Sequence, residues 1–245
     1  MKPFLILETG APIDSLRRHG GFGHWIRVAA GLHGRQVRHV PVADGAPLPE
    51  AGAFAGVFVT GSGAMVTDRE DWSERTAGWL RDAAHAGQPL FGICYGHQLI
   101  AHALGGTVDW NPNGREMGTV PVDVAADAGD DALFGGLPGR FDVHATHRQS
   151  VVAPPPGARV LARSDRDACQ AYRWGEAAWG VQFHPEFNTG VMRGYIAARA
   201  DALAEEGQCH RRLLQEVRPT PLARRVLRRF VDVARQRAGQ GSSRQ

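Results

Sequence analysis

The sequence contains almost no lysine: Lys2 is the only one, and every other residue in a Lys plus Arg total of 28 is arginine. Positive charge is concentrated near the C-terminus, where ten arginines between Arg211 and Gln245 face only two acidic residues. No basic stretch is interleaved with aromatic side chains, and no RNA- or DNA-binding motif occurs. A nucleic-acid partner is therefore not expected.

Long apolar runs are also missing. The opening MKPFLILETG is apolar only from Phe4 to Leu7, which is too short for the core of a signal peptide. No run approaches the roughly 20 apolar residues of a membrane-spanning helix. We therefore expect a cytoplasmic protein without a membrane partner.

Cysteine is scarce as well. Cys94, Cys169 and Cys209 are odd in number and far apart, which does not describe a disulfide framework. A zinc site needs closely spaced ligand pairs, and the adjacent Cys209 and His210 have no second pair. No phosphate-cradling GxxxxGK[ST] loop occurs. The sequence predicts no metal site and no cofactor.

The first half of the chain alternates between strand-like and helical patterns. The strand-like runs are residues 4–8, 36–42, 55–61 and 89–94, and the helical patterns are residues 24–32, 72–86 and 97–106. Several of these strands are continuously apolar, which is typical of a parallel sheet covered on both faces. For the helix at 72–86, Asp71 or Ser73 is expected to supply the capping oxygen.

The second half changes texture. Short alternating runs separated by Gly, Pro and Asp predict further strands, some of them antiparallel. From about Val191 the chain reads as helical, and in the last helix Leu222, Val226 and Phe230 recur at helical spacing. The arginines there are expected to face solvent. We predict a domain at 1–190, a C-terminal helical extension at 191–245 packed on it, and disorder near 239–245.

The stretch FGICYGHQ places Cys94 at the end of a predicted buried strand, before a helix. Ligands bind at the carboxyl ends of parallel strands. A tight strand-to-helix turn projects its residue into that cleft, and the helix N-terminus favours a thiolate. The alternative is a small buried core residue. A nearby base would favour a nucleophile.

Such a base is present in AWGVQFHPEF, which carries His184 and Glu186. Residues two apart on an extended chain point to the same side. A carboxylate that holds one imidazole nitrogen leaves the other free to take the thiol proton. Cys94, His184 and Glu186 thus form a candidate acyl-transfer triad, although a histidine and a surface glutamate taken singly could be incidental.

Together, GICYGHQL and VQFHPEF resemble the class I glutamine amidotransferase family, and most of all its stand-alone proteins related to the glutaminase domain of guanosine monophosphate synthetase. The resemblance implies a flavodoxin-like three-layer sandwich: a mostly parallel central sheet with helices on both faces. It also implies hydrolysis of the glutamine amide through a thioester on Cys94, with His184 as proton shuttle and Glu186 as its orienting group.

The resemblance assigns further positions. Backbone amides of Tyr95 and of the turn VTGSGAMV would form the oxyanion hole, with Ser62 as the preferred donor and Gly61 as the alternative. Gln98, Thr146 and His147 would bind substrate, and Gln149 stands where relatives commonly carry aspartate. The segment NPNGREMG, with Arg115 and Glu116, is either a border of the pocket or a surface turn.

Three functions follow from these residues. The first is a glutaminase that supplies ammonia to a separate synthetase subunit. The second is a stand-alone γ-glutamyl peptidase or hydrolase, and the third is a catalytically silent regulatory or binding member of the family. The expected ligand is a small molecule, either glutamine or another γ-glutamyl compound.

Overall fold

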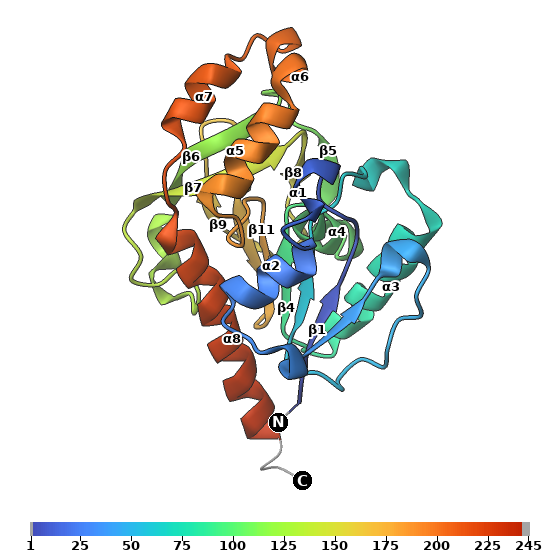
Figure 1. Ribbon diagram of the computed structural model, residues 1–245. Helices are drawn as coiled ribbons and strands as arrows, with labels where there is room; N and C mark the ends of the chain where they lie inside the picture. Colours follow the sequence, from blue (N-terminus) through green and yellow to red (C-terminus); the bar gives the residue numbers. More distant parts are fainter. Residues whose placement is uncertain (1, 242–245) are drawn as a thin grey trace.

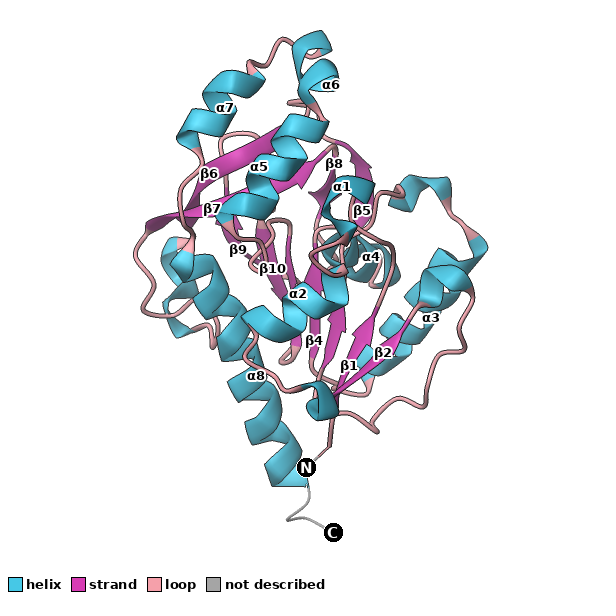
Figure 2. Cartoon of the chain, in the orientation of Figure 1, coloured by secondary structure: helices cyan, strands magenta, loops and turns pink. Residues whose placement is uncertain are grey.

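The computed structural model describes residues 2–241, and its centre is one nine-stranded sheet in the order β2-β1-β3-β4-β11-β10-β9-β6-β7 (Figures 1 and 2). The parallel strands are β2 (Val37–Val40), β1 (Phe4–Leu7), β3 (Val57–Val59), β4 (Leu90–Ile93) and β11 (Ala178–Val181). The antiparallel strands are β10 (Ala171–Trp174), β9 (Arg159–Arg163), β6 (Glu116–Val124) and β7 (Arg140–His147).

Eight helices are described: α1 (Asp14–Arg17), α2 (Phe22–Ala29), α3 (Asp71–His85), α4 (Tyr95–Ala103), α5 (Thr189–Ala198), α6 (Ala200–Glu205), α7 (His210–Glu216) and α8 (Pro221–Gly241). Helices α5 to α7 lie over β6 and β7, at the top of Figure 1. None of the helices within residues 2–241 is both long and apolar enough to cross a bilayer.

Helices cover both faces of the sheet because its central strands are apolar on both sides. In β1, Phe4 and Ile6 pack with residues of α2 and α8, whereas Leu5 and Leu7 pack with residues of α3 and α4. This follows from the alternation of side chains along a strand. The predicted mostly parallel sheet with helices on both faces, and the flavodoxin-like fold, are confirmed.

Helix α8 closes one face of the sheet through Phe230. The centroid of its ring lies 5.0 Å from that of Phe58 in β3 and 5.2 Å from that of Phe91 in β4. These two strands lie side by side at the centre of the sheet. The last helix of the chain therefore packs directly on the strands that lead into the candidate site.

Several expectations about α8 need correction. The arginines do not all face solvent: Arg228 donates to the Ala29 carbonyl at 3.1 Å, and Arg229 donates to the carbonyls of Leu133 and Gly135. The helix itself continues through Gly241, so residues 239–241 are helical rather than disordered. Helix propagation adds one hydrogen bond per residue and needs no new nucleus. Residues 242–245 lie outside the described residues.

Two smaller expectations also fail. Helix α3 begins after Glu70 without a side-chain cap, so neither Asp71 nor Ser73 caps it. Strand β8 (Gln149–Ala153) was not predicted as a separate strand, and it pairs antiparallel with β5 (Thr107–Trp110) in a second, two-stranded sheet. Its partner is distant in sequence, so no local pattern indicates it. The two-part division at residue 190 stays a prediction.

Candidate active site

Cys94 occupies the tight turn between β4 and α4, as its sequence context predicted. Its backbone has φ 52° and ψ −102°, in the positive-φ region that non-glycine residues seldom adopt. The Cys94 N–H donates to the carbonyl of Val181 at 2.9 Å, which fixes the turn to β11. Such strain persists only where the surroundings impose it, and it is concentrated at functional sites.

Gly92 and Gly96 make this turn possible by allowing close backbone contact. A Cβ atom at Gly92 would overlap the backbone of Gly96, and one at Gly96 would overlap the Val59 carbonyl. The Gly96 N–H also donates to Thr60 at 3.1 Å. Both glycines are therefore required by space, and they bring the start of α4 against the end of β3.

His184 and Glu186 lie in the turn after β11, not on an extended strand. The expected geometric route to their pairing is therefore wrong, because the strand ends at Val181 and the chain turns, with Phe187 N–H donating to the His184 carbonyl at 3.3 Å. The pair forms nevertheless: His184 Nδ1 lies 2.8 Å from Glu186 Oε1. Both side chains are buried.

The electrostatic surroundings keep His184 charged. Burial alone would lower the pKa of His184, but the Glu186 carboxylate and then the Cys94 side chain raise that pKa to about 10. His184 Nε2 is buried without a hydrogen-bond partner among the described residues. The Phe187 ring stacks on the imidazole with 4.0 Å between centroids. One ring nitrogen is thus held by carboxylate and the other remains available.

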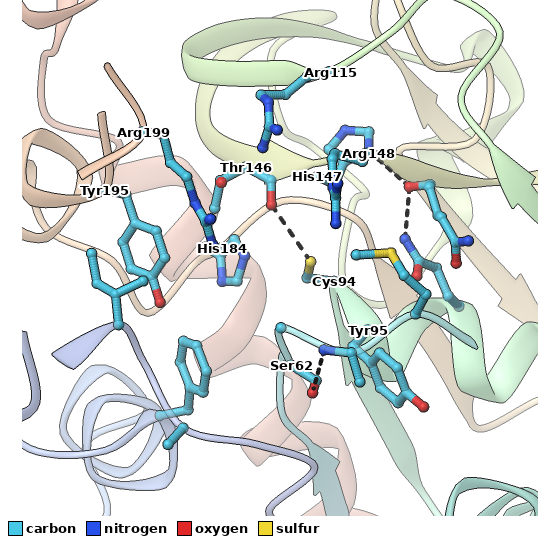
Figure 3. Close-up of a pocket in the computed structure, with 18 residues that line it drawn as sticks. Ser62, Cys94, Tyr95, Arg115, Thr146, His147, Arg148, His184, Tyr195 and Arg199 are labelled. Carbon is cyan, nitrogen blue, oxygen red and sulfur yellow. Dashed lines mark hydrogen bonds between the residues drawn. The ribbon is translucent and has the colours of Figure 1, made fainter. Parts of the chain in front are cut away.

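The turn after β3 approaches both reactive side chains. A Cβ atom placed on Gly61 would lie 3.1 Å from His184 Cε1 and 3.8 Å from Cys94 Cβ. Thr9 Oγ1 donates to the Gly61 carbonyl at 3.1 Å, and the Ser62 hydroxyl accepts from the Ala64 N–H at 3.1 Å. This turn therefore forms a fixed backbone surface beside Cys94 (Figure 3).

The described hydrogen bonds include none from the backbone N–H of Ser62, Gly61 or Tyr95. The Tyr95 hydroxyl lies 2.7 Å from Ser73 Oγ in α3, so the phenol end of its side chain is engaged away from Cys94. Ser62 and Tyr95 line the same pocket as Cys94. Their amide groups are available as donors near the sulfur.

Opposite this turn, the segment between β7 and β8 forms the other wall of the pocket. The Thr146 carbonyl lies 3.9 Å from Cys94 Sγ. Gln98 also lines the pocket, but its Nε2 donates to the Gln149 carbonyl at 2.7 Å and to Gln182 Oε1 at 2.9 Å. Gln98 therefore supports the wall with its amide hydrogens rather than offering them to a ligand.

A buried ion pair stands behind this wall, and sequence reasoning missed it. His147 Nε2 lies 2.9 Å from Glu116 Oε2, and His147 Nδ1 lies 3.0 Å from the Gln149 carbonyl. Since both neighbours are acceptors, both ring nitrogens donate and the imidazole is charged. Burial opposes that charge, but Glu116 and Asp167 raise the pKa of His147. Glu116 does not border the pocket, whereas its neighbour Arg115 does.

Arg148 and Arg199 were also missed, and both line the pocket with Arg115. They come from the β7–β8 turn and from the junction of α5 and α6, positions that only the folded chain brings together. The Arg148 guanidinium lies 5.0 Å from the Trp110 ring centroid, and the paired arrangement of Trp110 with Gln149 across β5 and β8 accounts for this contact. No local sequence pattern marks either arginine.

A parallel sheet with a strained cysteine at one strand end and a buried His-Glu pair beside it defines a class of protein. The family model for class-I glutamine amidotransferases matches residues 19–200, which is well over half of the chain. The chain belongs to the class I glutamine amidotransferase family.

Relatives of known name agree with this membership. A glutamine-hydrolysing GMP synthase of Aeropyrum pernix is 41% identical over 145 residues, covering 59% of this chain. The match spans only 26% of that relative, so the chain corresponds to about a quarter of it. A γ-glutamyl-L-1-hydroxyisopropylamide hydrolase of a Pseudomonas species is 30% identical over 174 residues, covering 67% of this chain and 59% of that protein.

The fold agrees as well. The crystal structure of a glutamine amidotransferase from Thermotoga maritima superposes with a TM-score of 0.76 and covers 96% of this chain and 99% of that one. At 21% sequence identity, this likeness concerns the fold.

Proposed function

We propose that this chain hydrolyses the side-chain amide of glutamine to glutamate and ammonia through a thioester on Cys94. The observation that carries the proposal is the strained Cys94 at the head of α4, in one pocket with a His184 whose other nitrogen is held by Glu186. The pocket takes a small γ-glutamyl substrate.

The first half-reaction uses the cysteine and the imidazole together. Cys94 transfers its proton to His184, and the thiolate attacks the γ-carbonyl carbon of glutamine. As the C–N bond breaks, His184 returns a proton to the leaving nitrogen, and ammonia departs. Glu186 holds the ring orientation and stabilises the imidazolium during both transfers.

The negative charge that develops on the carbonyl oxygen needs donors. The backbone amides of Tyr95 and Ser62 take this role, with Gly61 as the alternative to Ser62, because these amides are unengaged and two of the residues line the pocket. The proposal also assigns the amino-acid end of the substrate to the wall formed by Thr146, His147 and Gln98. Water then hydrolyses the thioester, with His184 as the base.

The fate of the ammonia is a separate part of the proposal. The match to the Aeropyrum pernix GMP synthase leaves about three quarters of that protein without a counterpart here. We infer that a separate partner subunit accepts the ammonia.

A second candidate keeps the chemistry and changes the substrate. Similarity to the Pseudomonas γ-glutamylamide hydrolase favours a stand-alone γ-glutamyl peptidase or hydrolase, which would need no ammonia acceptor. The third reading, a silent binding protein, predicts no turnover at all.

The test is the release of glutamate and ammonia from glutamine by the purified chain, with Cys94→Ala as control and a γ-glutamyl dipeptide in parallel. We expect glutamine turnover that Cys94→Ala abolishes. Turnover of the dipeptide alone would replace glutaminase by γ-glutamyl hydrolase. Turnover that survives Cys94→Ala would overturn the proposed mechanism.

A further inference from the structure

The pocket around Cys94 carries positive charge without matching negative charge. Its lining includes Arg115, Arg148, Arg199 and the charged His147, and none of its lining residues is an aspartate or a glutamate. A pocket of one charge sign raises the local concentration of ligands of the opposite sign. The charge of this pocket therefore constrains the substrate.

Only one of the three arginines is neutralised by a direct partner. Arg115 makes a two-point contact with the Glu206 carboxylate, with Nε at 2.7 Å and Nη2 at 2.9 Å. This ion pair lowers the pKa of Glu206. Arg115 is thus bound within the fold, and the guanidinium groups of Arg148 and Arg199 have no ion pair within residues 2–241.

The remaining two arginines repel each other. Burial, and then the charges of Arg115 and Arg199, lower the pKa of Arg148, while Glu206 and Asp68 offset part of the effect. Assembling like charges costs stability unless a ligand of opposite charge compensates. A guanidinium binds a carboxylate through two parallel hydrogen bonds, so carboxylates are suitable ligands for these positions.

The two arginines lie on different sides of the nucleophile. In Figure 3, Arg199 lies with His184 and Tyr195 on one side of Cys94, and Arg148 lies with His147 on the other. In the proposed reaction His184 protonates the leaving nitrogen, so the leaving group lies on the Arg199 side. The glutamyl amino-acid end then extends toward Arg148.

The amino-acid end meets a neutral group beside Arg148. Gln149 lines the pocket and is almost fully buried, and its Oε1 has no hydrogen-bond partner among the described residues. Its Nε2 donates to Thr67 Oγ1 at 2.6 Å, which fixes the amide. A buried oxygen without a partner is unfavourable until a donor arrives, and the substrate α-nitrogen is such a donor.

We propose that the site hydrolyses γ-glutamyl amino acids, in which the leaving amine carries a carboxylate, and that Arg199 binds this carboxylate. This inference rests on the proposed function and specifies its substrate. The step is balanced as before: a C–S bond forms, the C–N bond breaks, His184 gives the nitrogen its proton, and a free amino acid leaves. Water then releases glutamate.

A matched pair of substrates isolates the carboxylate. γ-Glutamylglycine and γ-glutamylglycinamide differ only in the carboxylate of the leaving amine, and glutamine serves as a third substrate. We expect wild-type kcat/KM to be about 10- to 100-fold higher for γ-glutamylglycine than for the glycinamide, as a charge-assisted hydrogen bond supplies. Arg199→Gln should remove most of that ratio.

Two further variants locate the effect. Arg148→Gln should lower kcat/KM for both substrates alike, because both share the glutamyl end. Arg225→Gln, at an exposed position of α8, removes one arginine of the same charge outside the pocket and should keep the ratio.

The outcomes separate this inference from the proposed function. A wild-type ratio near one, or an unchanged ratio in Arg199→Gln, would overturn the assignment of Arg199 and its substrate class while glutamine turnover still stood. No turnover of any of the three compounds, together with failure of a glutamine chloroketone to label Cys94, would overturn the proposed function and this inference with it.

Discussion

At the scale of single residues, His184 is held between groups that determine its charge. Glu186 contacts its Nδ1, and Cys94 faces the same pocket, so its pKa stays high despite burial. An imidazolium beside a thiolate favours the ionised pair that attacks a carbonyl. Removing the carboxylate charge should therefore reduce both the population of this pair and the alignment of the ring.

Glu186→Gln tests this dependence because the side chain keeps its shape. We expect kcat/KM to fall by about 10²- to 10⁴-fold, the range typical of losing a general base or its orienting group. Without Glu186, burial dominates and the pKa of His184 falls, so the basic limb of the pH–rate profile should move to lower pH. Glu205→Gln, which alters an exposed glutamate, is the control. A basic limb that does not move would contradict the role of Glu186.

The sequence predicted the residues of this triad more reliably than their geometry. Cys94 was placed correctly because glycines, a buried strand and a helix pattern are local signals. His184 and Glu186 were paired through an extended strand, and the structure pairs them through a turn. Arg148, Arg199 and the Glu116–His147 pair could not be predicted, because contacts distant in sequence create them.

At the scale of elements, α8 supports the strands that lead into the site. Phe230 is fully buried and packs against Phe58 of β3 and Phe91 of β4. The same strands end at Gly61 and Cys94 respectively. Packing on one face of the sheet thus fixes the two backbone segments that meet at the pocket.

Phe230→Ala should cost about 3–5 kcal/mol of unfolding free energy, since truncating a buried phenylalanine loses apolar burial and leaves a cavity. Arg225→Ala, on the exposed side of the same helix, should change it by less than about 0.5 kcal/mol. Urea denaturation of both variants measures the difference. Equal stabilities would mean that α8 does not support the sheet.

The strands and helices themselves were largely predictable, because apolar runs and glycine or proline boundaries are local. The cap of α3 was wrong because a capping residue is a preference that Glu70 overrides here. Strand β8 was missed because its pairing with β5 is non-local. Arg228 and Arg229 were assigned to solvent because sequence periodicity does not reveal carbonyls of other segments.

At the scale of the whole molecule, buried histidines of two kinds determine how stability depends on pH. Burial lowers the pKa of His97 to about 3 and that of His144 to about 4. The pKa values of His147 and His184 are raised instead. The unfolded chain should titrate all four near pH 6.5.

The signs of these shifts predict a stability maximum near pH 6.5. Below it, unfolded His97 and His144 bind protons that the folded chain refuses, so stability falls as pH falls toward about 4. Above it, folded His147 and His184 keep protons that the unfolded chain releases, so stability falls as pH rises. Asp167, whose pKa burial raises, acts against the acid limb.

Comparison with His144→Asn cancels the contribution of Asp167. Between pH 5 and 6, the slope of unfolding free energy against pH should be smaller in the variant by about 1.4 kcal/mol per pH unit, the effect of one proton. Chemical denaturation at a series of pH values measures both curves. Parallel curves would mean that His144 titrates normally in the folded chain.

The central claim concerns the bond between Cys94 and the substrate, and acid quenching of the chain during turnover of glutamine tests it directly. The account predicts that mass spectrometry of the digested protein finds a glutamyl group on the peptide containing Cys94, and that neither Cys94→Ala nor an unreacted control carries it. Turnover of glutamine at a normal rate with no such adduct, or with the adduct on Cys169 or Cys209, would contradict the account.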